Sequence, residues 1–192
     1  MRLDATVLLQ ATNSTLDDKT MAWGTLTTLM QGDHGGSTAA GAPFGNIQSF
    51  AEVDGTPYFY IIMGDPVGEN AFGPNAGPRA ALTVTEAELG NVVTGSSQLP
   101  FMCKIGLIGD PENPPPARLV FSGSLKNVTD TVELAAAKEA LFTRHPQFKT
   151  YPDSHGFFVV KLDISGIWMI AMYGNASIVT LDDYFAAKCL FR

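Results

Sequence analysis

The fold is decided by RLVFSGSL (118–125), DTVELAAAKEALFTRHP (130–146) and FFVVKLDIS (157–165). In this order the three segments predict a strand, a helix and a second strand. Asp130 with Glu133 three residues later is a capping-box pattern that begins a helix. The apolar stripe of that helix is Leu134, Ala137 and Leu141, and Pro146 ends it. On both sides apolar and polar residues alternate, which is the period of a half-buried strand.

Short strands separated by turn residues account for most of the remaining chain. Asp54-Gly55 predicts a hairpin, because glycine accepts the positive φ that a tight turn needs. A run of Gly and Pro at 64–78 leaves room for only one or two helical turns near 69–72. The other expected elements are strands at 25–27, 46–51, 58–62, 80–85, 167–173 and 178–179, turns at Ser165-Gly166 and Gly174-Asn175, and a short helix from Thr180 through Ala187.

About eight strands with one central helix, and no alternation of strand and helix, favour a mainly β fold: an antiparallel barrel with peripheral helices. A chain of 192 residues is expected to form a single compact domain. Only 16% of its residues are charged, whereas 45% are hydrophobic. Because an average domain is about 25% charged, apolar surface is expected in a core or at a subunit interface.

Charge and composition exclude several classes of partner. The net charge of -7, with 12 Lys plus Arg, argues against binding to nucleic acid. The sequence has no apolar run long enough for a membrane span and no convincing signal peptide.

Two cysteines, Cys103 and Cys189, allow at most one disulfide. Asparagine sequons occur at Asn13, Asn127 and Asn175, which indicates a secreted glycoprotein.

Common catalytic signatures are absent from the sequence, including the GxSxG elbow, the Walker loop, GxGxxG and HExxH. A metal site at His145 and His155 is disfavoured, because the spacing between them fixes no geometry. His145 is instead expected at the end of the helix, where the helix dipole favours an imidazolium. Cys103 is expected to be an ordinary thiol, and Trp168 a core or interface residue rather than a cofactor stack.

Several segments resemble the CREG family in the same order. In the first half these are WGTLTT (23–28), APFGN (42–46), VDGTPYFY (53–60) and ALTV (81–84). In the second half they are AKEALFTRHP (137–146), KTYPDSH (149–155), FF (157–158), KLDI (161–164), IW (167–168), YG (173–174) and IVT (178–180). The resemblance implies the FMN-binding split barrel of the pyridoxamine phosphate oxidase-like superfamily, assembled as a homodimer. We expect one barrel domain at 23–187, an N-terminal segment at 1–22 packing on it, and a tail at 188–192.

Split barrels of this kind hold FMN between subunits, and the phosphate needs convergent donors. The donors offered by this chain are Asn46, Ser49, Asn70, Arg79 and Thr83, with Thr85 and Lys161 as further candidates. Glu69 stands beside Asn70, and a carboxylate near a phosphate is unfavourable. The loop at 91–116 resembles the family segment associated with an obstructed pocket. The expected cofactor is therefore none or FMN.

Two functions follow from these observations. The leading hypothesis is a CREG-like glycoprotein of the secretory or endolysosomal route. It would act through a protein receptor or a glycan-mediated partner, with an obstructed flavin-type pocket and no catalytic residue. The alternative is an FMN-dependent oxidoreductase acting on a small molecule, because flavin chemistry does not need a catalytic side-chain motif. No metal ion is expected in either case.

Overall fold

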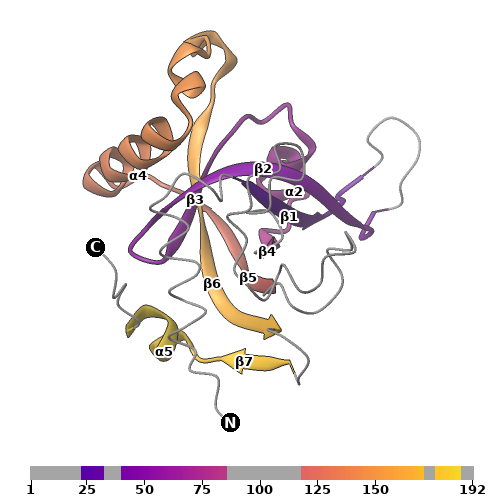
Figure 1. Ribbon diagram of the computed structural model, residues 1–192. Coiled ribbons are helices and arrows are strands. Elements are labelled where there is room, and N and C mark those ends of the chain that lie inside the picture. The colour runs from indigo at the N-terminus through magenta and orange to yellow at the C-terminus, as the bar shows by residue number, and fades with distance from the viewer. Residues whose placement is uncertain (1–22, 33–39, 86–117, 171–175, 187–192) are drawn as a thin grey trace, which may run out of the picture. The chain divides into compact units, whose positions relative to one another are not determined.

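A computed structural model describes residues 23–32, 40–85, 118–170 and 176–186 (Figure 1). The predictions for the segment 1–22, the loop 91–116 and the tail 188–192 lie outside these residues, as do Asn13, Asn175, Cys103 and Cys189. The elements are β1 (Trp23–Leu29), β2 (Pro43–Val53), β3 (Thr56–Ile61), α2 (Pro66–Phe72), β4 (Arg79–Thr85), β5 (Arg118–Asn127), α4 (Thr131–Arg144), η2 (Pro146–Thr150), η3 (Asp153–His155), β6 (Phe158–Ile170), β7 (Ser177–Val179) and α5 (Leu181–Ala186).

The strands hydrogen-bond in the order β3-β2-β1-β4-β5-β6-β7, and β3 also pairs with β6. The first six strands therefore close on themselves, and β7 is an additional strand beside β6. The prediction of a mainly β, antiparallel barrel with few helices is confirmed. Within the described residues, no helix is both long and apolar enough to cross a bilayer.

By contacts the chain divides into two compact units. Among the described residues, the α4 unit comprises 23–32, 40–82 and 122–165, and the β7 unit comprises 83–85, 118–121, 166–170 and 176–186. In the β7 unit, Ile167 to Met169 of β6 pair antiparallel with β7. The Tyr184 ring of α5 meets Phe121 edge-on, with 5.4 Å between the ring centroids. Trp168, expected in a core or an interface, is 37% exposed and pairs with Ile178.

The α4 unit is built on an antiparallel meander of β1, β2 and β3. The predicted hairpin turn is confirmed: Asp54 and Gly55 have φ of 50° and 83°, the two positive values of a type I′ turn. β3 also pairs with β6, Tyr58 lying opposite Lys161. One core cluster joins α4 to these strands; its buried members are Ala51, Tyr58, Val128, Ala137, Leu141, Phe148 and Val159.

The predicted central helix is confirmed as α4, with the predicted N-cap. The Asp130 carboxylate accepts hydrogen bonds from the backbone N–H groups of Val132 and Glu133, at 3.0 and 2.9 Å. Of the predicted stripe, Ala137 and Leu141 are fully buried and Leu134 is half-buried. The helix ends at Arg144, before the proline, as expected.

The prediction of a turn at Ser165-Gly166 is wrong, because β6 is one continuous strand of 13 residues. Both of its ends are paired, the first with β3 and the last with β7. Buried and exposed residues alternate through Leu162 and Ile164, and the alternation starts again at Ile167. The positions of the buried residues therefore shift by one residue at Gly166. This slip is what a bulge produces, and glycine tolerates it without ending the strand.

Candidate functional site

Asn70 is the predicted site residue that the structure defines best. Asp65 caps α2 by accepting from the Val67 N–H at 2.8 Å, and Pro66 fits the first helical turn. The Asn70 side chain, one turn later, is fully buried. Its Nδ2 donates to Thr28 Oγ1 at 3.0 Å, and its Oδ1 accepts from the Gln31 N–H at 3.3 Å. Asn70 therefore fastens α2 to the end of β1.

An open cleft of about 570 Å³ lies beside α2. Its lining residues are Gln31, Gly32, Met63, Gly64, Glu69, Gly73, Pro74 and Asn75. Among the described residues that line the cleft, Glu69 is the only charged one. A carboxylate in the wall repels a phosphate, so this cleft is a poor place for the phosphate of a flavin.

The two donors expected on β2 point to opposite sides of that strand. Asn46 lies opposite Leu26 in the ladder, and Ser49 lies opposite Trp23. Leu26 is buried whereas Trp23 is exposed, which fixes the inner and outer faces of this ladder. Because side chains alternate along a strand, Asn46 belongs to the inner face and Ser49 to the outer face. One phosphate cannot accept hydrogen bonds from both side chains here.

Arg79 and Thr83 are on β4, where the buried residues are Ala80, Leu82 and Val84. Arg79 is exposed at the start of the strand in the α4 unit, and Thr83 is half-buried in the β7 unit. The five expected donors thus include one fully buried amide that is already bonded and two side chains on opposite faces. These placements concern the described residues of one chain, so the five-donor set stays a prediction.

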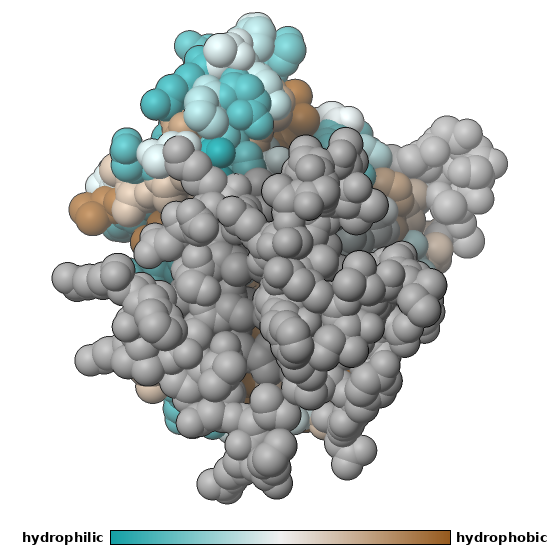
Figure 2. Space-filling model, in the orientation of Figure 1, coloured by the Kyte–Doolittle hydropathy of each residue, from teal (hydrophilic) through white to brown (hydrophobic). Residues whose placement is uncertain are grey.

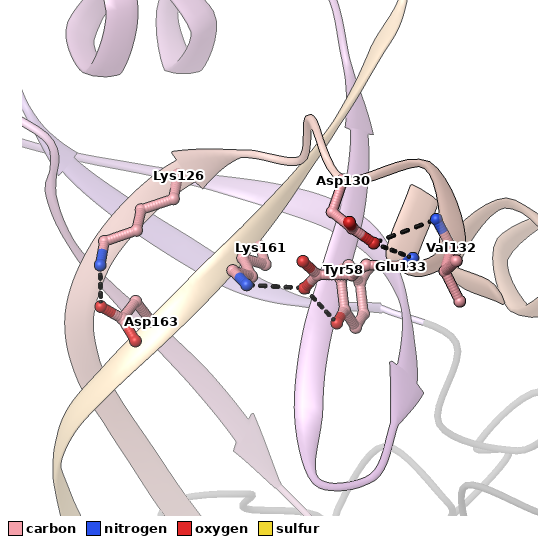
Figure 3. Close-up of polar contacts among 7 residues, drawn as sticks. All are labelled: Tyr58, Lys126, Asp130, Val132, Glu133, Lys161 and Asp163. Atoms are coloured by element: carbon pink, nitrogen blue, oxygen red, sulfur yellow. Dashed lines mark hydrogen bonds and ion pairs between the residues drawn. The ribbon is translucent and has the colours of Figure 1, made fainter. Parts of the chain in front are cut away.

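Lys161, the further phosphate candidate, belongs to a polar network that the sequence did not predict (Figure 3). Its Nζ lies 2.6 Å from Glu133 Oε1, which also accepts from the Tyr58 hydroxyl at 2.8 Å. The capping-box pattern directs the Glu133 carboxylate back toward the N-cap, but here it joins β3 and β6 to the first turn of α4. A second ion pair joins Lys126 to Asp163.

This network shifts the pKa values of its members. The hydrogen bond from Lys161, followed by that from Tyr58, lowers the pKa of Glu133, so its carboxylate stays ionised. Burial, reinforced by the same carboxylate, raises the pKa of Tyr58. The network is therefore a fixed charge arrangement at neutral pH, in which the tyrosine is a donor and not a base.

His145 corrects another expectation from the sequence. It caps the C-terminus of α4, is buried, and its Nε2 lies 2.9 Å from the carbonyl oxygen of Phe50. Burial lowers the pKa of His145; the hydrogen bond to the Phe50 carbonyl opposes this shift in part, and the neighbouring Arg144 adds to it. The neutral imidazole is thus favoured over the imidazolium that the helix dipole alone predicted, because desolvation outweighs the dipole. In the part of the chain that the structure describes, no three metal-ligating side chains gather.

The sequon at Asn127 ends β5. Asn127 and Thr129 are exposed, and Val128 between them is buried in the core cluster. The Val128 N–H donates to the carbonyl oxygen of Val159 at 3.0 Å, which fixes the backbone at the middle of the sequon. The acceptor side chain is therefore displayed to solvent from a rigid strand end.

Comparison with known proteins identifies the family of this chain. The family model described as "CREG, beta-barrel" matches residues 19–186. The chain is 33% identical to human Protein CREG1 over 168 residues, covering 85% of this chain and 67% of that protein. It is 35% identical to chicken (Gallus gallus) Protein CREG1 over 174 residues, covering 86% of this chain and 80% of that protein.

Solved structures support the same fold. A heme-binding protein from Mycobacterium smegmatis superposes with a TM-score of 0.68 at 21% identity, over 98% of this chain and 62% of that one. A putative pyridoxamine 5'-phosphate oxidase from Listeria innocua gives a TM-score of 0.50 at 17% identity, over 83% of this chain and 95% of that one. The family match extends over most of the residues that build the strands and helices, and so the chain belongs to the CREG beta-barrel family.

Proposed function

We propose that this chain is a CREG-type glycoprotein of the secretory or endolysosomal route that acts by binding a partner and not by turning over a substrate. One observation carries the proposal: the sequon Asn127-Val128-Thr129 is displayed with its acceptor exposed at the end of β5. An N-linked glycan is bulky and hydrophilic, so its acceptor must be exposed in the folded protein. Asn13 and Asn175 remain further acceptors in this proposal.

The absence of turnover is supported by the way the described polar residues are used. Asn70 and Lys161 hydrogen-bond within the fold, and His145 is buried against the Phe50 carbonyl. An obstructing loop at 91–116 belongs to the same proposal. The protein would then present surfaces to a receptor, directly or through its glycans.

Glycosylation is tested by producing the full chain behind a secretion signal in a eukaryotic host and measuring its mass before and after endoglycosidase treatment. We expect a mass loss on treatment, and a smaller loss for Asn127→Gln than for the unmodified sequence. Asn75→Gln is the matched control, because Asn75 is an exposed asparagine outside any sequon. A native mass that endoglycosidase leaves unchanged would remove the main support for the secretory proposal.

A homodimer is part of this proposal. Ile47 is 62% exposed in the middle of β2, opposite Thr25 on the same face of the ladder. A chain with only 16% charged residues has apolar surface to cover, and a second copy of the same face covers it symmetrically. Sedimentation at micromolar concentration should give a dimer that Ile47→Lys dissociates. Val132→Lys, at a residue 77% exposed on α4, should leave the dimer intact; a monomeric parent protein would refute this part.

The alternative function is an FMN-dependent oxidoreductase. It is supported by the fold, since one solved structure with a similar fold is named a putative pyridoxamine 5'-phosphate oxidase. Arg79 favours it as well, because an exposed guanidinium on β4 is available to pair with a phosphate. Visible absorption of the purified protein, before and after adding FMN and removing the excess, separates the two functions. One retained flavin per subunit, lost in Arg79→Ala, would replace our proposal.

A further inference from the structure

The segment from Pro146 to Gly156 joins α4 to β6 through the two short helices η2 and η3 (Figure 1). All of its residues are exposed except Phe148, which is buried. Figure 2 shows that the surface over this end of the α4 unit is mainly hydrophilic. An exposed connection of this length usually follows no fixed path, so the contacts that hold it are informative.

Aromatic rings support the segment from beneath. Phe148 packs against Tyr60 of β3 and against Tyr151, with ring centroids 5.5 and 5.3 Å apart. Phe157 stacks on Tyr60 at 5.1 Å and an interplanar angle of 24°, and it also contacts Tyr151 at 4.8 Å. The Tyr151 ring therefore rests on two other rings. Aromatic pairs of this kind add stabilisation beyond their buried area, so the ring is held in place.

Backbone geometry holds the rest of the segment. The Thr150 hydroxyl donates to the Gln147 carbonyl at 2.7 Å. The His155 and Gly156 N–H groups donate to the carbonyl oxygens of Pro152 and Asp153, each at 3.0 Å. Gly156 takes a φ of 70°, which returns the chain toward β6. The exposed side chains between these points are thus presented by a fixed backbone.

The chemistry of the presented side chains selects the ligand. Tyr151 is 37% exposed as a residue and offers an aromatic side chain, and Asp153, Ser154 and His155 offer a carboxylate, a hydroxyl and an imidazole close by in the chain. The positive charge of Lys149 and the negative charge of Asp153 cancel. The segment therefore favours neither an anionic nor a cationic ligand. A protein hot spot needs a desolvated apolar cluster, which this hydrophilic surface lacks. A neutral ligand with one apolar face and many hydroxyls fits these groups.

We propose that the segment 146–156 is a binding surface for a neutral carbohydrate. The Tyr151 ring lies against the C–H face of a pyranose, and the Asp153 carboxylate accepts hydrogen bonds from its hydroxyls. Ser154 and His155 complete the polar contacts, since both residue types donate and accept hydrogen bonds. A few fixed polar groups beside an apolar surface are the usual means of orienting a small ligand.

The test uses the full chain after endoglycosidase treatment, so that its own glycans do not compete. The probes are an array of immobilised neutral oligosaccharides, and then the methyl glycosides of mannose, galactose and N-acetylglucosamine in saturation-transfer NMR. We expect Tyr151→Ala to weaken binding at least about tenfold, and Tyr151→Phe, which keeps the ring, to stay within about twofold. Asp153→Ala should weaken binding as well, and Val132→Ala on α4 should not.

Several outcomes would overturn the proposal. One is that no neutral glycan is retained at millimolar concentration by a protein with native circular dichroism. Another is binding that neither Tyr151→Ala nor Asp153→Ala weakens, which would place the ligand elsewhere. A preference for sulfated over neutral glycans would contradict the charge argument. Because Asp153 is exposed, its variant keeps the test valid even if Tyr151→Ala disturbs the aromatic packing. None of these results depends on whether the protein is itself glycosylated or dimeric.

Discussion

Replacing Asn70 with alanine separates a structural role of this residue from a cofactor-binding role. The side chain is fully buried and joins α2 to the end of β1 through Thr28 Oγ1 and the Gln31 N–H. Thr28 is itself only 1% exposed, so water does not readily replace the lost amide. The substitution therefore removes these two hydrogen bonds and the longer contact of Asn70 Nδ2 with Met30 Sδ at 3.7 Å, and it leaves the partners without the side chain that satisfies them.

The expected cost follows from those two groups. A buried polar group left without its partner costs about 1–3 kcal/mol. Alanine recovers roughly 0.5 kcal/mol because it favours the helix more than asparagine does. With two such groups, the net loss in the free energy of unfolding is about 1.5–5.5 kcal/mol, a large part of the roughly 5–15 kcal/mol that stabilises a typical domain. At about 2–4 °C per kcal/mol, the melting temperature should fall by roughly 3–22 °C.

Urea denaturation followed by circular dichroism, with and without excess FMN, measures this loss. Asn75→Ala is the control, because Asn75 is exposed in the turn after α2 and should change stability by no more than about 0.5 kcal/mol. A double-mutant cycle with Thr28→Val should show coupling between the two side chains. The reasoning fails if Asn70→Ala is as stable as the control. A loss that appears only when FMN is present would assign the amide to the cofactor instead.

Three further changes test other parts of the structure. Gly68→Ala should destabilise the fold by more than about 2 kcal/mol, because its Cβ would collide with backbone, whereas Gly64→Ala has open space and should be neutral in the same urea titration. Glu133→Gln should lower the free energy of unfolding by about 1 kcal/mol, and by less at high salt. In a Lys161→Met background, Glu133→Gln should leave the free energy of unfolding unchanged. Burial lowers the pKa of His145 below its unfolded value, so the unfolded state alone gains a proton as the pH falls below about 6.5. Stability should therefore drop between pH 7 and pH 5, and His145→Gln should reduce that drop; an unchanged pH profile would contradict the burial argument.

The elements that the sequence predicted correctly are those whose causes are local. The type I′ turn needs only Asp54 and Gly55, and the N-cap of α4 needs only Asp130 and the N–H groups two and three residues later. Alternation along residues 118–125 predicted a half-buried strand, and within β5 Leu119, Phe121 and Leu125 are buried. Each of these patterns is complete within a window of about ten residues, where propensity and periodicity are informative.

The features that the sequence did not predict depend on residues that are distant in the chain. Glu133 meets Tyr58 across 75 positions and Lys161 across 28. The burial of His145 depends on Phe50, which is 95 positions away. The continuity of β6 through Gly166 depends on ladders with β3 and β7, and a local Ser-Gly pair alone resembles a turn. Tertiary contacts override the local preference in each case.

The same contrast bears on function. Asn70 and Lys161 were candidate phosphate donors in the sequence, yet each makes a contact that joins two segments of the fold, as does His145. A chain with few charged residues uses such polar contacts to fix the packing of its elements, because each one would be costly to leave unpaired. Among the described residues, the groups to which our proposals assign partner contacts are instead exposed, at Asn127 and along the segment 146–156.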